Sequence, residues 1–273
     1  MAVTVSSGAA DIRPGEAPAD RRRELAVYFA AVGVFAAAAV LTVYFTRSMS
    51  GGMEMPGGWS MSMAWMPMGG WLASGAMFAA MWVAMMVAMM LPSTLPMLLL
   101  YRRVQSFRGA AHLGALCWLV GSGYFLVWLL FGMAAFVAGT MMARAAMQWE
   151  TFSRAVPVAS GMALVVAGVY QLTPWKSACL RHCRDPLLLL AGHVQGGWRG
   201  ALRLGLHHGA FCAACCWALM LIQLTLGVMS LAVMAVVAVV IALEKLLPRG
   251  LLVARLTGAA AIAGGLFLAV RAL

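Results

Sequence analysis

Seven stretches of mostly apolar residues, each about 20 residues long, restrict the fold of this chain more than any other feature. A helix needs roughly 20 such residues to cross the hydrocarbon core of a bilayer. Of the 273 residues, 64% are hydrophobic and only 10% are charged, too few to cover the surface of a soluble domain. We therefore predict an all-α, polytopic transmembrane helix bundle of about seven spans that contacts the lipid bilayer. The predicted spans lie near 26–46, 72–100, 113–139, 156–173, 205–226, 229–246 and 255–271.

One bundle accounts for nearly the whole chain. Residues 1–24 are polar and contain prolines, which predicts a disordered tail. Residues 25–273 form the bundle, with a methionine-rich loop at 47–71 and a segment containing cysteine and histidine at 174–204. Three arginines precede the first apolar stretch, as in a signal peptide, but that stretch is too long and lacks a small-residue cleavage site. We expect an uncleaved first span.

The basic residues are divided unequally between the two sides of the predicted bundle. With the N-terminus inside, 15 of the 19 lysines and arginines are cytoplasmic, in agreement with the positive-inside rule. This predicts a multi-pass membrane protein with residues 1–24 and 174–204 in the cytoplasm and 47–71 outside. The bias also explains the formal charge of +11 without nucleic acid, since no basic surface interleaved with aromatic residues is present.

Two classes of membrane protein are disfavoured by what the spans lack. No Asp, Glu or Lys falls in the middle of a predicted span, and Glu244 is expected at a cytoplasmic end beside Lys245. Ion-coupled transporters usually carry ionisable groups at depth. The sequence also lacks a GxxxxGK[ST] motif, so we expect no nucleotide-driven pump.

Methionine is concentrated in one part of the chain: 14 of 23 residues lie between Met49 and Met97. Thioethers are soft, neutral ligands that suit Cu(I) far better than Mg²⁺, Ca²⁺ or Zn²⁺. Closely spaced methionines in a polar, glycine-rich external loop therefore predict capture of a soft metal ion. An apolar skin lying on the membrane is the alternative interpretation of this loop. The predicted loop ligands are Met53, Met55, Met61, Met63, Met66 and Met68.

The second predicted span continues the methionine pattern. Met77, Met81, Met85 and Met89 advance around a helix in steps of about 40°. Such a ribbon predicts a path for Cu(I), with Met85 and Met89 as ligands, although methionine also serves as adaptable packing. Pro92 and Pro96 are expected to close this span.

Five of the six cysteines lie in two short motifs at the predicted cytoplasmic boundary. On a helix, His208, Cys212 and Cys215 share one narrow face, with Cys216 beside them and His207 off it. The residues of the other motif stand at i, i+3 and i+4. The cytoplasm is reducing, so thiolates with imidazoles predict a Cu(I) or Zn(II) site there rather than a disulfide. The remaining cysteine and two other histidines are interpreted as packing residues. The predicted inner ligands are Cys179, His182, Cys183, His208, Cys212, Cys215 and Cys216, and the packing residues are Cys117, His112 and His193.

Four sequence runs within residues 72–250 together resemble a bacterial family of predicted metal-binding integral membrane proteins of unknown function, some of them labelled copper chaperones. The resemblance implies metal handling, most plausibly of copper, on the matching residues, and a location in the bacterial inner (plasma) membrane. The methionine loop and the N-terminal tail are less clearly part of it. The runs are Met85-Met86-Val-Ala-Met89-Met90-Leu-Pro92-Ser-Thr-Leu-Pro96-Met97, Tyr170-Gln171-Leu-Thr-Pro174-Trp-Lys176 leading into Cys179-Leu-Arg-His182-Cys183, His208-Gly-Ala-Phe-Cys212-Ala-Ala-Cys215-Cys216-Trp217, and Glu244-Lys245.

These features predict a non-enzymatic membrane protein that collects Cu(I) at the external loop and passes it to the inner cysteines and histidines. The ion would then be imported or delivered to a partner, a copper chaperone or a cuproenzyme. Two alternatives stay open. One is a membrane thiol–disulfide oxidoreductase that uses Cys212 and Cys215 with a quinone. The other is a scaffold in which Zn(II) is purely structural.

Overall fold

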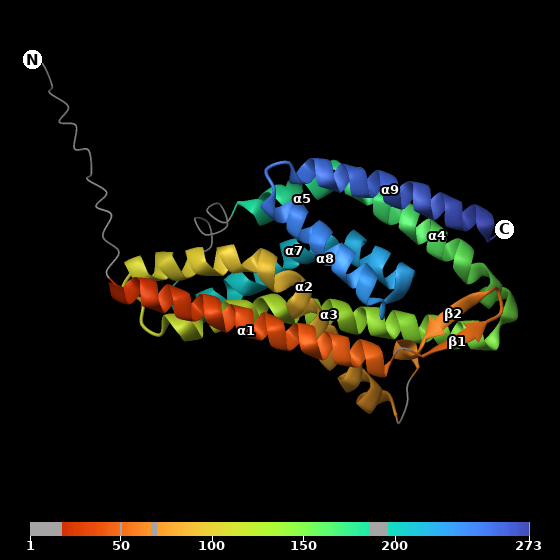
Figure 1. The fold of residues 1–273 in the computed structure, drawn as a ribbon, viewed down its shortest axis with the longest axis horizontal. Coiled ribbons are helices and arrows are strands. Elements are labelled where there is room, and N and C mark those ends of the chain that lie inside the picture. The colour runs from red at the N-terminus through yellow and green to blue at the C-terminus, as the bar shows by residue number, and fades with distance from the viewer. Residues whose placement is uncertain (1–17, 50, 67–69, 186–195, 273) are drawn as a thin grey trace, which may run out of the picture.

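The computed structural model describes residues 18–49, 51–66, 70–185 and 196–272, and its fold is the predicted all-α bundle (Figure 1). Long helices run roughly side by side, and a small hairpin of two strands lies at one end. The helices are α1 (Pro18–Ser48), α2 (Trp71–Phe107), α3 (Leu113–Gln148), α4 (Glu150–Leu172), α5 (Pro174–Arg184), α7 (Gly197–Gly227), α8 (Leu231–Leu246) and α9 (Gly250–Arg271).

Six helices in the described parts of the chain are long and apolar enough to cross a membrane: α1, α2, α3, α4, α7 and α9. The sixth predicted span, 229–246, corresponds to α8, which has 16 residues. At about 1.5 Å per residue it extends roughly 24 Å, less than a bilayer core of roughly 30 Å. The structure also extends α1 back to Pro18, into the predicted tail, whereas residues 1–17 lie outside the described residues.

Helix α2 continues past the prolines that were expected to close its span. Pro92 and Pro96 both lie inside the helix, which ends only at Phe107. The hydroxyls of Ser93 and Thr94 donate to the carbonyl of Met90 over 2.9 and 2.8 Å. Hydroxyl side chains of this kind help a membrane helix to tolerate proline.

Glycines allow two helices at the C-terminal side of the bundle to pack backbone against backbone. A Cβ built at Gly168 of α4 would lie 2.6 Å from the carbonyl oxygen of Gly258 in α9, and one at Gly161 would lie 2.7 Å from that of Gly265. Real Cβ atoms do not approach so closely, so α4 and α9 can pair in this way only with glycine at the contact. Close packing of small residues is the usual source of helix association in lipid.

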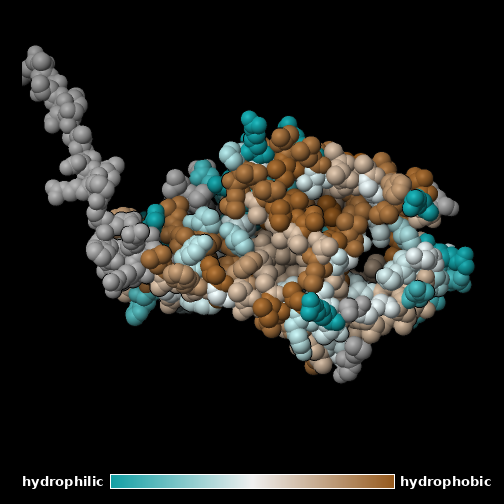
Figure 2. Space-filling model, viewed as in Figure 1, coloured by the Kyte–Doolittle hydropathy of each residue, from teal (hydrophilic) through white to brown (hydrophobic). Residues whose placement is uncertain are grey.

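Apolar side chains point outward over much of the bundle, as contact with lipid requires. Leu130 of α3, Val166 of α4, Val236 of α8 and Leu256 of α9 are all exposed. Figure 2 shows hydrophobic residues over much of the face on which α8 and α9 lie.

The methionine-rich segment forms an antiparallel hairpin rather than an open loop. Strands β1 (Gly52–Met55) and β2 (Trp59–Ser62) pair in register, and a short 3₁₀ helix, η1 (Met63–Trp65), follows. The hairpin is tied to the first part of α4. The indole of Trp59 donates to the Ser153 carbonyl over 3.0 Å, and the Ser153 hydroxyl donates to the Pro56 carbonyl over 2.8 Å.

Candidate metal centre

The buried face of α7 carries the cysteines that the sequence placed together. Cys212, Cys215 and Cys216 are completely buried, and His208 is almost so. All four lie on the side of α7 that packs against neighbouring helices, which confirms the predicted common face. The ring of His208 stacks on Tyr124 of α3 at 5.4 Å between centroids. Its Nδ1 atom is buried and makes no hydrogen bond to any described residue.

Helix α5 brings the second motif to the first. Thr173 caps this helix by accepting from the Lys176 amide, and Pro174 occupies its first turn. The helix packs along α7, and the thiol of Cys215 interacts with those of Cys183 and Cys216. The thiols of Cys212 and Cys216 also interact. The two motifs therefore meet in space.

The histidines of this region lie around an aromatic side chain. His182 of α5 stacks on Phe211 of α7, with ring centroids 4.0 Å apart, and meets His207 edge-on at 5.5 Å. His207 also contacts Phe211, at 4.8 Å. The imidazoles of α5 and α7 thus form a second contact between these helices, beside the thiols.

Two lysines complete the centre; both stand in the sequence runs that carry the family resemblance, but neither was predicted as a site residue. The chain has only two lysines, Lys176 and Lys245, because all its other basic residues are arginines. Both lysines are buried beside the cysteines. Glu244 and Lys245 lie in the last turn of α8, at a helix end as expected, but both are buried in the bundle. The scarcity of lysine, together with the position of Lys176 three residues before Cys179, was the available signal.

Lys176 forms a buried ion pair with Glu244, with 2.6 Å between Nζ and Oε2. The same ammonium donates to the Cys215 carbonyl over 2.8 Å, and the Gln171 amide donates to Glu244 over 2.9 Å. Burial by itself lowers the pKa of Lys176, but the nearby Cys215, Cys216 and Glu244 raise this pKa above its ordinary value. These contacts join Gln171 of α4, Lys176 of α5 and Glu244 of α8 to the backbone of Cys215 in α7.

Lys245 is directed at a thiol instead of a carboxylate. Its Nζ atom donates to Cys212 Sγ over 2.9 Å and to Ser93 Oγ over 3.4 Å. The Tyr124 hydroxyl shares a hydrogen bond with the same sulfur, also at 2.9 Å. The Cys212 thiol therefore lies between an ammonium and a phenol, and both can stabilise negative charge on the sulfur.

The methionines of α2 lie in the same core as the cysteines. Met81, Met85, Met86, Met89 and Met90 are buried and belong to one cluster with Cys212, Cys215 and Cys216, whereas Met77 is half exposed. The amide of Gln223 in α7 donates to Met85 Sδ over 3.0 Å. Three of the four ribbon methionines, Met81, Met85 and Met89, are therefore buried in the core that also contains the cysteines.

The hairpin methionines are less exposed than an open loop would leave them. Met53 is 46% exposed, but its cross-strand partner Met61 is 1% exposed and Met55 is 7% exposed. Met63 and Met66 are partly buried, and Met68 lies outside the described residues. Met55 and Met61 belong to the same core cluster as the α2 methionines. The exposed thioether of Met53 thus lies beside the buried thioethers of Met55 and Met61.

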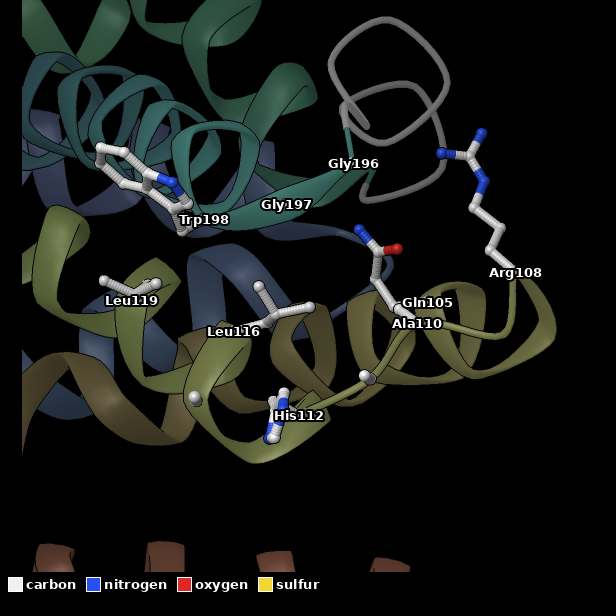
Figure 3. Close-up of a pocket in the computed structure, with 11 residues that line it drawn as sticks. Gln105, Arg108, Ala110, His112, Leu116, Leu119, Gly196, Gly197 and Trp198 are labelled. Atoms are coloured by element: carbon white, nitrogen blue, oxygen red, sulfur yellow. The ribbon is translucent and has the colours of Figure 1, made fainter.

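A cavity of about 610 Å³ opens elsewhere, between the α2–α3 turn and the start of α7 (Figure 3). Gln105, Arg108, His112 and Trp198 line it, together with small and aliphatic residues, and no described cysteine does. Cys117 packs in a separate apolar cluster with Met97 and Tyr101. Cys117 is therefore a packing residue within that cluster, as expected, whereas His112 is exposed at the cavity rather than packed in a core. His193 lies outside the described residues.

Within the described residues, no three His, Cys, Asp or Glu side chains are arranged as a ready metal site. The soft donors are instead grouped as neighbouring thiols with thioethers in the adjoining core.

No curated protein and no solved structure is similar enough to match this chain. The family described as "PpoB2: Copper chaperone" does match, over residues 79–268. That range covers well over half of the chain and includes α5, α7, the cysteines and both lysines, but not the hairpin. The chain therefore belongs to the PpoB2 family of copper chaperones.

Proposed function

We propose that this protein receives Cu(I) at the methionine hairpin and passes it through the membrane core to the thiols shared by α5 and α7. The meeting of Cys183 with Cys215, beside Cys212 and Cys216, is the observation that carries this proposal. Membership of a copper chaperone family supports copper as the cargo. The zinc scaffold is disfavoured because thioethers, which hardly bind zinc, adjoin the thiols.

The change from methionine ligands at the hairpin to cysteine ligands at α5 and α7 gives the transfer a direction. Thioethers in the hairpin and α2 are neutral, whereas a cysteine ligand becomes an anionic thiolate when it binds metal. A cuprous ion that moves from Met53 and Met61 toward Met85 and then to Cys212 gains stronger ligands at the last step. The transfer then needs neither nucleotide nor an ion gradient. With the hairpin outside and α5 in the cytoplasm, the movement is inward, to a copper chaperone or cuproenzyme.

Serine substitution tests the inner site. Cys212→Ser with Cys215→Ser keeps side-chain size nearly constant but replaces soft sulfur by a hard hydroxyl. We expect bound Cu(I) to fall by about one equivalent in competition titrations of the purified chain against a chromophoric Cu(I) chelator. Cys117→Ser is the matched control and should bind normally, because Cys117 packs in a separate cluster. Full copper binding by the double variant would refute the inner site.

Leucine substitution tests the entrance. Replacing Met53, Met61 and Met63 together by leucine conserves volume and hydrophobicity but removes three thioethers. Insertion should be normal, equilibrium binding at the thiols should be retained, and copper uptake by cells should slow. Unchanged uptake would show that the hairpin is structural only.

The approach of Cys183 to Cys215 favours one second candidate function, a thiol–disulfide oxidoreductase. In that role the two thiols would be oxidised to a disulfide while a quinone was reduced to a quinol. Reduction of a soluble quinone by the metal-free protein, lost in Cys183→Ser and in Cys215→Ser, would support it.

A further inference from the structure

The centre holds an uneven set of buried charges. In the described part of the chain Glu244 is the only buried acidic side chain, and Lys176 already neutralises it at 2.6 Å. Lys245 is 9% exposed and has no carboxylate partner among the described hydrogen bonds, which run to Cys212 Sγ and Ser93 Oγ. Two ammonium groups and one carboxylate leave one positive charge. A buried charge without a counter-ion costs several kcal/mol, so this centre favours an anion beside Lys245.

The nearest source of negative charge is the pair formed by Cys212 and Cys216, whose thiols interact. A cuprous ion bound by two thiolates has a net charge of −1. With the Lys245 ammonium beside it, the assembly is neutral. A divalent ion on the same two thiolates is neutral by itself, so Lys245 would leave that assembly with one buried positive charge. The same lysine therefore stabilises the monovalent complex and opposes the divalent one.

We propose that Lys245 is the counter-charge of a Cys212–Cys216 bis-thiolate site, and that it selects a monovalent soft ion, Cu(I) or Ag(I), over a divalent one. The inference rests on the proposed function and specifies its cargo. Binding is a ligand exchange without electron transfer: two Cu–S bonds form, the thiols release their protons, and copper stays Cu(I). The Tyr124 hydroxyl, 2.9 Å from Cys212 Sγ, donates to the same anionic sulfur.

Removal of the charge gives a direct test. Lys245→Met keeps a long apolar side chain and deletes the ammonium, and it leaves no carboxylate unpaired, because Glu244 remains bound to Lys176 and Gln171. The purified full-length chain is titrated with Cu(I) and with Zn(II) against competing chelators. Only binding that disappears in Cys212→Ser/Cys216→Ser is counted.

We expect the ratio of Cu(I) affinity to Zn(II) affinity to fall by about tenfold or more in Lys245→Met, the usual effect of a group that supports a metal ligand. Lys245→Arg, the charge-conserving control, should keep the ratio near that of the wild type. A purely structural lysine would weaken both metals together. An unchanged ratio with normal Cu(I) binding would overturn the inference and leave the proposed function intact. Absence of Cu(I) binding by the wild type would overturn both.

A second measurement needs no variant and therefore does not depend on how Lys245→Met folds. With one equivalent of Cu(I) on the wild type, X-ray absorption at the copper edge should show two sulfur ligands. Three or more sulfur ligands would overturn the bis-thiolate site, whereas loss of the copper signal on washing would contradict the proposed function itself.

Discussion

Two lysines, each beside a cysteine of α7, show how much of this centre depends on single residues. Lys176 reaches the backbone of Cys215 and the carboxylate of Glu244, whereas Lys245 reaches the sulfur of Cys212. The first interaction holds helices together, and the second places a charge beside a proposed metal ligand. Substitutions at the two positions should therefore differ in kind.

Lys176→Met should strongly destabilise the fold, because it leaves the buried Glu244 without its counter-ion. Breaking such a pair from one side costs about 3–5 kcal/mol. The double variant Lys176→Met/Glu244→Gln removes both charges and should recover most of that loss. Thermal unfolding in detergent, followed by circular dichroism, measures both variants. If the double variant is no more stable than Lys176→Met, the unpaired Glu244 carboxylate is not the cause of the destabilisation.

The positions of the thiols could be predicted from the sequence, but those of the lysines could not. His208, Cys212 and Cys215 share a face because of the helical repeat, a local property that residue spacing contains. The pairing of Lys176 with Glu244 joins residues 68 positions apart, and only the packing of α5 against α8 creates it. Without that packing, Glu244 and Lys245 resemble an ordinary polar helix end.

At the scale of whole elements, the hairpin and the α4–α9 pair also depend on contacts between residues far apart in the sequence, which residue spacing does not predict. The two-residue spacing of Met53 and Met55 was interpreted as metal-ligand spacing, but it is also the repeat of a strand, which puts both side chains on one face. Short strands tied to α4 were not predicted, since their contacts with Ser153 lie far along the chain. The helical type of the spans was predicted because apolar length determines it. Their ends were not, since α3 continues to Gln148 beyond the predicted 139 and α7 begins at Gly197 before the predicted 205.

Gly168→Ala should separate α4 from α9, because the added Cβ meets the Gly258 carbonyl oxygen at 2.6 Å. Overpacking of this kind costs about 1–3 kcal/mol. Gly264→Ala in α9 is the matched control, with nothing within 4 Å of its new Cβ, and should be neutral or slightly stabilising. Unfolding midpoints in detergent compare the two. Equal midpoints would mean that the glycine contact does not limit how closely these helices pack.

At the scale of the whole molecule, the proposed transfer requires the hairpin and α5 to face opposite sides of the membrane. The hairpin lies by the junction of α3 and α4, and α5 follows at the far end of α4 (Figure 1). Helix α4 has 23 residues and is one of the six candidate spans, so its two ends lie on opposite sides once it crosses. Opposite placement of the hairpin and α5 thus follows from one helix, whereas the assignment of inside and outside depends on the arginine bias.

Cysteine labelling in intact cells tests that assignment. Ser60 at the hairpin and Arg181 on α5 are both exposed, so a new cysteine at either place can react. We expect a membrane-impermeant maleimide to label Ser60→Cys in intact cells and Arg181→Cys only after permeabilisation, because 15 of 19 basic residues then lie inside. The wild type corrects for Cys117, Cys179 and Cys183, which are partly exposed. Labelling of both positions from outside would mean that α4 does not cross the membrane. The reverse pattern would place the thiols on the oxidising side, where copper import of the proposed kind fails and the thiol–disulfide oxidoreductase becomes the better interpretation.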